Sequence, residues 1–224
     1  MKHLIAPSVL SADFANLQKD IEMINRSDAD WFHIDIMDGV FVPNISYGFP
    51  VLKAIQKYAK KPLDVHLMIE QPDRYAGEFI EAGADCVNVH LEARHQVART
   101  LASIRERGCR AGLAINPATL LKHAIPLLPL CDQLICMTVN PGFGGQAFLP
   151  EVLPKIREAR DVIVLQNYNV DITVDGGVSD ATAASCSAAG ANIMVAGSHL
   201  FSQSDLTQAV ANLRAAAGSA NVTG

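Results

Sequence analysis

Short apolar runs alternate along the chain with stretches in which apolar residues recur every three or four positions. The runs are typical of strands buried on both faces, and the spaced pattern is typical of amphipathic helices. We therefore predict strands at 4–10, 31–37, 62–69, 85–90, 111–115, 133–139, 171–175 and 192–196. Helices are predicted near 14–24, 51–59, 72–82, 95–107, 118–127, 151–165, 179–189 and 204–217.

This alternation amounts to about eight strand–helix units of roughly 28 residues each, which is the size of the repeating unit in a TIM barrel. The predicted fold class is therefore α/β, a single-domain (β/α)8 barrel over residues 1–217. The small and polar tail, 218–224, is expected to be flexible. A doubly wound open sheet is the alternative architecture, and the absence of a GxGxxG turn after the first apolar run counts against it.

Composition narrows the class of protein. Half of the 224 residues are hydrophobic and the formal net charge is −5. Such a chain is too apolar to be disordered, and its acidic balance argues against a nucleic-acid partner. No apolar run is long enough for a membrane span, and no secretory signal is evident, so we expect a cytoplasmic protein with no membrane partner. The five scattered cysteines are expected to be reduced thiols.

Polar residues that could carry chemistry lie at the ends of predicted strands. His33 and Asp35 share one face of the second strand, His66 lies on the third, and Asp175 ends the seventh. A charged or imidazole side chain inside a barrel costs several kcal/mol unless it is paired or ligated. Two imidazoles and two carboxylates can surround one divalent cation, so the four predict a metal site. The alternative is that each is a hydrogen-bonded core residue.

Four further residues near strand ends have less specific patterns. His90 closes the fourth strand, and we expect it to be a polar residue that lines the barrel mouth rather than a fifth ligand. Met37, Met68 and Met137 fall near strand ends as well. For them, core packing and a soft apolar wall over a substrate are equally good interpretations.

Glycine-rich turns follow the last three predicted strands. They comprise residues 140–146, the pair Gly176 and Gly177, and Gly197 with Ser198. Glycine lets backbone amides approach an anion closely, and barrels of this class often hold phosphate between their last loops. The turns predict a phosphate site formed by amides and serine hydroxyls. No lysine occupies an inward strand end, which argues against a Schiff-base aldolase.

Five segments together resemble the ribulose-phosphate 3-epimerase family, in order and spacing, from one end of the chain to the other. They are APSVLSADF at 6–14, HIDIMDGVFVPN at 33–44, DVHLM at 64–68, VNPGFGGQ at 139–146 and VDGG at 174–177.

The resemblance implies a (β/α)8 barrel that epimerises D-ribulose 5-phosphate at C3 to D-xylulose 5-phosphate through an enediolate. It implies Asp35 and Asp175 as the acid/base pair, and one divalent ion (Zn²⁺, Fe²⁺, Mn²⁺ or Co²⁺) on His33, Asp35, His66 and Asp175. A phosphorylated ketose is the implied substrate, and a homo-oligomer the implied assembly. The implied substrate-binding residues are Ser8, His66, Gly142, Phe143, Gly144, Gly145, Asp175, Gly176, Gly177, Gly197 and Ser198.

Three alternatives share much of this pattern. A sister epimerase for a six-carbon ketose phosphate, such as D-allulose 6-phosphate, would have the same core. A lyase related to hexulose-phosphate aldolases would carry an Asp-x-Lys-x-x-Asp array, but the matching stretch at 64–68 has no lysine. A phosphosugar-binding barrel without catalysis would not need both a complete metal shell and two acids.

Overall fold

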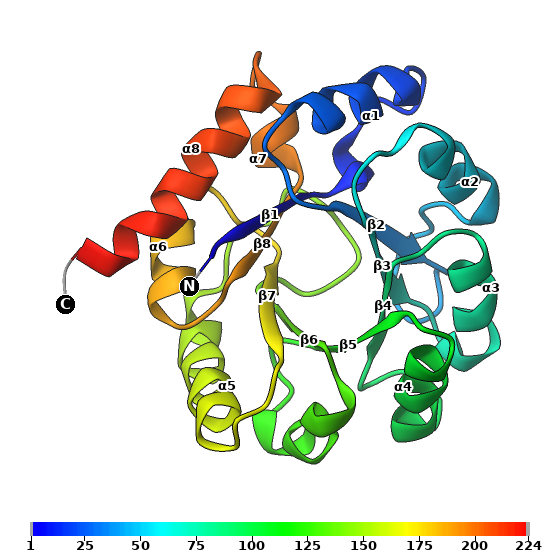
Figure 1. Cartoon of the computed structure of the whole chain (residues 1–224), viewed down its shortest axis with the longest axis vertical. Helices are drawn as coiled ribbons and strands as arrows, with labels where there is room; N and C mark the ends of the chain where they lie inside the picture. Colours follow the sequence, from blue (N-terminus) through cyan, green and yellow to red (C-terminus); the bar gives the residue numbers. More distant parts are fainter. Residues whose placement is uncertain (1, 223–224) are drawn as a thin grey trace.

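The computed structural model describes residues 2–222. Eight parallel strands form a ring inside an outer ring of helices (Figure 1). The strands are β1 (Leu4–Pro7), β2 (Phe32–Met37), β3 (Leu63–Met68), β4 (Cys86–His90), β5 (Arg110–Ile115), β6 (Gln133–Met137), β7 (Asp171–Asp175) and β8 (Ile193–Ala196).

The α-helices are α1 (Leu17–Arg26), α2 (Phe49–Tyr58), α3 (Ala76–Glu81), α4 (Val97–Glu106), α5 (Leu153–Leu165), α6 (Asp180–Ala188), α7 (Ser198–Phe201) and α8 (Leu206–Gly218). Short 3₁₀ turns complete the connections: η1 (Val9–Ser11), η2 (Pro72–Arg74), η3 (Leu121–His123), η4 (Ile125–Leu130), η5 (Pro150–Val152) and η6 (Ser219–Val222).

The strand order confirms the predicted barrel. Neighbouring strands run β1-β8-β7-β6-β5-β4-β3-β2, each pair parallel. Between β1 and β2 the ring is closed by an isolated β-bridge from Ser8 to His33. Nearby, the amide of Asp30 donates a hydrogen bond to the carbonyl of Ile5 at 2.8 Å. Sequential parallel order around a ring is the barrel topology, so the open-sheet alternative is excluded.

Three predicted helices differ from the observed ones, and proline is the cause in one of them. The stretch 118–127 was expected to be helical, but η3 and η4 replace it, with Pro126 and Pro129 in η4. Proline lacks the amide hydrogen that an α-helix needs. The stretch 72–82 divides into η2 and α3, and the first helix begins only at Leu17.

Alternation along β2 separates the core from the site. Phe32, Ile34 and Ile36 pack against the surrounding helices. His33 and Asp35 point the other way, into the barrel, and are buried there. The apolar layer between strands and helices therefore stabilises the fold, while the interior positions are left for polar groups.

The remaining fold predictions concern the tail, membranes and cysteines. Helix α8 reaches Gly218 and η6 follows it, so 219–222 are ordered as a 3₁₀ turn, while 223–224 lie outside the described residues. The flexibility expected for 218–224 stays a prediction. Within 2–222, no helix is both long and apolar enough to cross a bilayer. All five cysteines are free and buried.

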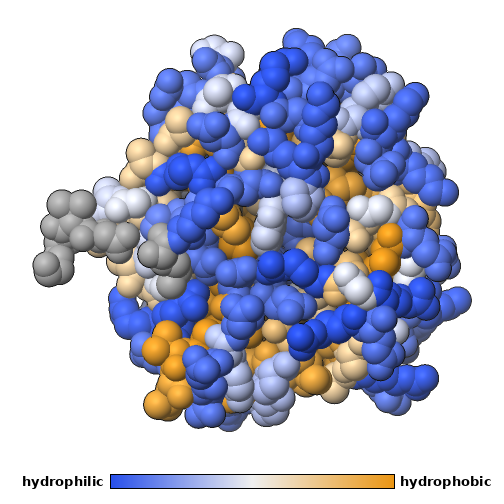
Figure 2. All heavy atoms as spheres, in the orientation of Figure 1, coloured by the Kyte–Doolittle hydropathy of each residue, from blue (hydrophilic) through white to orange (hydrophobic). Residues whose placement is uncertain are grey.

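Figure 2 shows a face that is mostly hydrophilic, with apolar groups gathered at its lower left.

Candidate active site and metal centre

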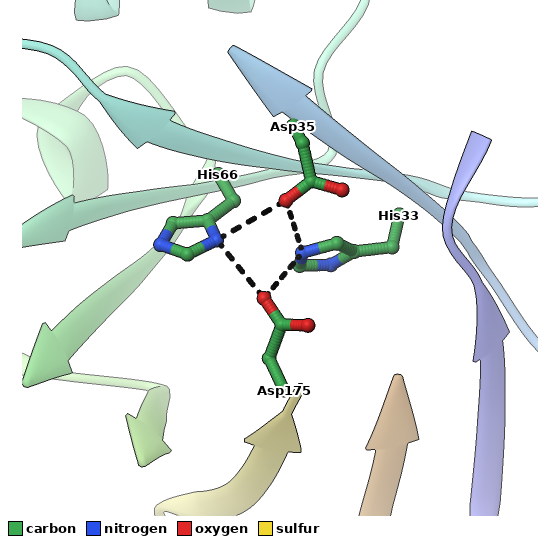
Figure 3. A group of neighbouring side chains, drawn as sticks. All are labelled: His33, Asp35, His66 and Asp175. Carbon is green, nitrogen blue, oxygen red and sulfur yellow. Dashed lines mark ion pairs between the residues drawn. The ribbon is translucent and has the colours of Figure 1, made fainter. Parts of the chain in front are cut away.

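Four side chains meet inside the barrel near the strand ends (Figure 3). Asp35 Oδ1 lies 3.4 Å from His33 Nε2 and 3.5 Å from His66 Nδ1. Asp175 Oδ2 lies 3.5 Å and 3.3 Å from the same two nitrogens. Ligand atoms about 2.1 Å from one cation are roughly 3.0–3.4 Å apart at right-angled or tetrahedral positions. The spacing of the four atoms is therefore close to that of one ion's ligands.

Two nitrogens in this cluster have no hydrogen-bond partner although they are buried: His33 Nε2 and His66 Nδ1. Both face the carboxylate oxygens of Asp35 and Asp175 (Figure 3). Unpaired buried polar atoms are rare, and four converging donors of this type suit a divalent cation. The residues present thus fit a metal ion, and the donor set is compatible with Zn²⁺, Fe²⁺, Mn²⁺ or Co²⁺.

The electrostatics of the cluster favour positive charge. Burial acts to lower the pKa of His33, but the neighbouring Asp35, Asp175 and Asp64 raise it well above the usual value. Burial acts to raise the pKa of Asp35, but His33 and His66 hold it well below the usual range. The carboxylate of Asp35 therefore attracts cationic charge into the barrel, as a proton on an imidazole or as a metal ion.

A buried polar layer supports His33 from below. The strand register sets His33 beside Asp64, and His33 Nδ1 lies 2.8 Å from Asp64 Oδ2. Asn88 Nδ2 donates to Asp64 Oδ1 at 2.6 Å, and Gln133 Nε2 donates to Asn88 Oδ1 at 3.0 Å. Because the carboxylate accepts the Nδ1 hydrogen, the ring of His33 is fixed with Nε2 facing the cluster.

A second chain of contacts stands behind His66. Its Nε2 lies 2.9 Å from His90 Nε2, and His90 Nδ1 lies 3.1 Å from Glu92 Oε2. His90 was expected to line the barrel mouth, but it is wholly buried, with Phe41 and His66 against its ring. Burial lowers the pKa of His90 to about 4, so this imidazole is neutral at pH 7.

An open pocket lies above the four-residue cluster. It contains about 570 Å³ of empty space, counted with the solvent at its mouth. Asp35 and Asp175 reach it from β2 and β7, which are three positions apart around the ring. Ser8 lines it as well and donates to Asp35 Oδ2 at 2.5 Å. The predicted wall, Met37, Met68 and Met137, also borders the pocket, and all three are buried.

The predicted glycine turns border the same pocket. The structure brings together Gly142, Phe143, Gly144, Gly145, Gly176, Gly177, Gly197 and Ser198.

Close packing explains why Gly177 is glycine. A Cβ on Gly177, where φ is +65°, would lie 2.5 Å from the amide nitrogen of Phe148. A Cβ on Gly197 would lie 2.6 Å from Ser11 Oγ, so that turn approaches the Ser11 hydroxyl closely. Ser11 and Ser198 line the pocket together with these glycine turns. Glycine-rich turns beside hydroxyl groups are a suitable setting for an oxyanion.

Comparison with known proteins gives the family. The model of the ribulose-phosphate 3-epimerase family matches residues 4–201. A curated protein named ribulose-phosphate 3-epimerase from Synechocystis is 46% identical over 213 residues, which cover 94% of this chain and 93% of that protein. The chain belongs to the ribulose-phosphate 3-epimerase family. An epimerase of the same name from Bacillus subtilis is also 46% identical, covering 94% of this chain and 97% of its own length.

Membership of the epimerase family makes the chain an isomerase-class enzyme. A solved structure of 3-hexulose-6-phosphate synthase from Salmonella typhimurium has a TM-score of 0.68 and 18% identity, and covers 98% of this chain and all of its own. At that identity the likeness reflects the barrel fold alone. The lyase alternative therefore gains no support from it.

Some residues that support the site were given no role from the sequence. Asp64 lies on the same face of its strand as His66, and Asn88 and Gln133 are polar residues in mostly apolar runs, so all three had a detectable signal. Glu92 had none, since it follows β4 in a connection where charged residues are common. Ser11 belongs to the matching segment at 6–14 but was given no role there, and the structure places it at the pocket.

Proposed function

We propose that this epimerase-family enzyme interconverts D-ribulose 5-phosphate and D-xylulose 5-phosphate by moving protons at C3, with Asp35 and Asp175 as acid and base. The observation that carries the proposal is that these two carboxylates reach one pocket from strands three positions apart around the ring, as a two-sided proton transfer requires. The relatives' printed name, ribulose-phosphate 3-epimerase, supports a phosphorylated ribulose as the substrate.

The chemistry requires two acids on opposite faces. The C2 carbonyl acidifies the C3–H bond, so a carboxylate on one side can take that proton and leave an enediolate. A carboxylic acid on the other side then gives its proton to the opposite face of C3, which inverts the centre. The two aspartates exchange roles when the reaction runs backwards. Each positioned acid or base supplies about 10²–10⁴ in rate.

A divalent cation held by His33, Asp35, His66 and Asp175 would polarise the substrate oxygens as a Lewis acid. Ser8 holds Asp35 by donating to Oδ2, which leaves Oδ1 directed at the two imidazoles. The two histidines act against burial and lower the pKa values of Asp35 and Asp175. The aspartate that serves as the acid must therefore take up its proton before it can give it to C3.

The phosphate would lie at the glycine turns and not over the acids. Residues 142–145, Gly176, Gly177 and Gly197 offer backbone amides there, and Ser198 offers a hydroxyl. A substrate anchored there would extend its carbon chain toward the carboxylates and the three methionines, which line the same pocket. These substrate-binding roles, and the homo-oligomer, rest on the family resemblance.

The test is turnover in deuterated water. The purified protein, loaded with one of the four metal ions, is incubated with D-ribulose 5-phosphate and followed by NMR. We expect xylulose 5-phosphate to form with deuterium at C3, whereas D-allulose 6-phosphate, run in parallel, should exchange more slowly. A protein that binds one metal ion but incorporates no deuterium into either substrate refutes the proposal, as a pure binding barrel would behave in this way.

A further inference from the structure

A line of hydrogen bonds leads from the proposed metal centre to the connection after β4. His66 presents Nδ1 to the cluster and Nε2 to His90, 2.9 Å away. His90 Nδ1 is 3.1 Å from Glu92 Oε2. The other oxygen of Glu92 accepts a bond from the amide of Asn116 at 2.8 Å and one from the hydroxyl of Thr119. We propose that Glu92 is a positioning residue for the metal, acting through His90 on His66.

The argument follows the hydrogens along the line. An ionised carboxylate only accepts, so His90 must place its hydrogen on Nδ1, facing Glu92. A neutral imidazole has one N–H, which leaves His90 Nε2 as an acceptor. His66 must therefore place its own hydrogen on Nε2. Its Nδ1 is then a bare lone pair, and this nitrogen is the unpartnered one that faces Asp35 and Asp175.

The two ligand histidines are thus prepared in different ways. His33 has its hydrogen held directly by Asp64, a carboxylate that is buried in the barrel. His66 has no carboxylate of its own and relies on one further out, whose side chain is 23% exposed. Glu92 therefore reaches the metal centre from a position outside the pocket, and it does not contact any of the four ligand residues through the bonds described.

Substitution of Glu92 by glutamine should reverse the direction of hydrogen-bond donation between His66, His90 and residue 92, because the two side chains have nearly the same shape and differ in their hydrogen-bonding groups. The amide has one oxygen, and two donors, the amide of Asn116 and the hydroxyl of Thr119, already claim it. Its NH₂ group then faces His90 Nδ1, which must become an acceptor. His90 would donate from Nε2, and His66 would have to carry its hydrogen on Nδ1, where a metal ion has to bind.

This inference rests on the proposed metal centre, so the test begins with the unaltered protein. Zinc-loaded protein with ¹⁵N-labelled histidine is examined by NMR, and affinity for Zn²⁺ is measured by competition with a chelator for the protein and for Glu92→Gln. The expected tautomers are Nδ1–H for His90 and Nε2–H for His66. Affinity should fall about 10- to 100-fold in Glu92→Gln, the usual effect of losing a partner of a ligating histidine.

Glu70→Gln is the matched control. Glu70 is also a carboxylate in a connection after a strand, but its side chain pairs with Arg94 at the surface, so Zn²⁺ affinity should be unchanged. If the unaltered protein binds Zn²⁺ and His90 is found as the Nε2–H tautomer, or if Glu92→Gln binds Zn²⁺ as tightly as the unaltered protein, the relay is refuted while the proposed function stands. If the unaltered protein binds no Zn²⁺ at all, the metal centre itself fails, and the inference with it.

Discussion

Gly112 on β5 occupies a position where the barrel interior has no room for a side chain. The register sets it directly between Asn88 on β4 and Gln133 on β6. A Cβ at this position would lie 1.7 Å from Asn88 Oδ1 and 2.6 Å from its Cγ. We therefore predict that Gly112→Ala forces Asn88 to move, by about 1.5 Å or more if the amide oxygen is to regain ordinary contact.

The cost follows from what Asn88 holds. Its Nδ2 donates to Asp64 Oδ1 at 2.6 Å and its Oδ1 accepts from Gln133 at 3.0 Å, all within the buried interior. Overpacking costs about 1–3 kcal/mol. Each buried group left without a partner adds about 1–3 kcal/mol. Overpacking with one group left unpaired therefore costs roughly 2–6 kcal/mol, a large part of the ordinary stability of a domain, about 5–15 kcal/mol.

The measurement is urea unfolding followed by circular dichroism, with Gly218→Ala as the control. Gly218 ends α8 with nothing within 4 Å of its would-be Cβ, so alanine there should be neutral or stabilise by up to about 1 kcal/mol. Gly112→Ala should also bind metal more weakly, because Asp64 would lose a partner and hold His33 less firmly. Unfolding of Gly112→Ala within about 1 kcal/mol of the unaltered protein would contradict the packing argument.

Three further predictions concern catalysis, phosphate binding and acid stability. Asp35→Asn and Asp175→Asn should each reduce turnover of D-ribulose 5-phosphate by about 10²–10⁴ with an unchanged circular dichroism spectrum, and retention of a tenth of the activity by either would remove it from the acid/base pair. Ser198→Ala should raise KM more than it lowers kcat in steady-state kinetics, and the reverse pattern would place the phosphate elsewhere. Arg214→Ala should cost about 2 kcal/mol in urea unfolding, since Arg214 donates to Asp30 at 2.7 Å. Burial acts to raise the pKa of Asp30, but a backbone amide and Arg214 hold it below its usual value. The ionised Asp30 therefore contributes stability above the unfolded pKa of about 3.9, and this contribution is lost as the pH falls below that value. Between pH 5 and 3 the Arg214→Ala protein should lose less stability than the unaltered protein. Equal losses would refute the pairing.

The fold was predictable because its signals are local and repeated. Strands buried on both faces leave unbroken apolar runs, and the observed β2, β4 and β7 coincide with the predicted runs to within one residue. The stretch after β5 was less predictable, because the apolar spacing of a helix is present while Pro126 and Pro129 prevent one. The spacing of apolar residues shows which face of a helix would be buried, but it does not show that proline removes a backbone hydrogen-bond donor.

The candidate metal ligands were predictable because polar residues interrupt or end apolar strands. His33, Asp35 and His66 do so, and the structure brings them to one centre with Asp175. The partners behind them depend on register between strands, and register is not visible in one strand's sequence. The contacts of Asp64 with His33 and of His90 with His66 could be seen only in the folded barrel.

The pairing of β1 with β8 has a consequence for how the protein matures. The first strand of the chain takes its neighbour from residues 193–196, near the other end. A ribosome releases the N-terminal segment early, and that segment must wait, unpaired on this side, until almost the whole polypeptide has been made. Ser8 follows β1 directly, so its hydrogen bond to Asp35 should be among the last contacts of the centre to form. A nascent chain stalled before β8 would carry all four ligand residues and still lack a finished centre.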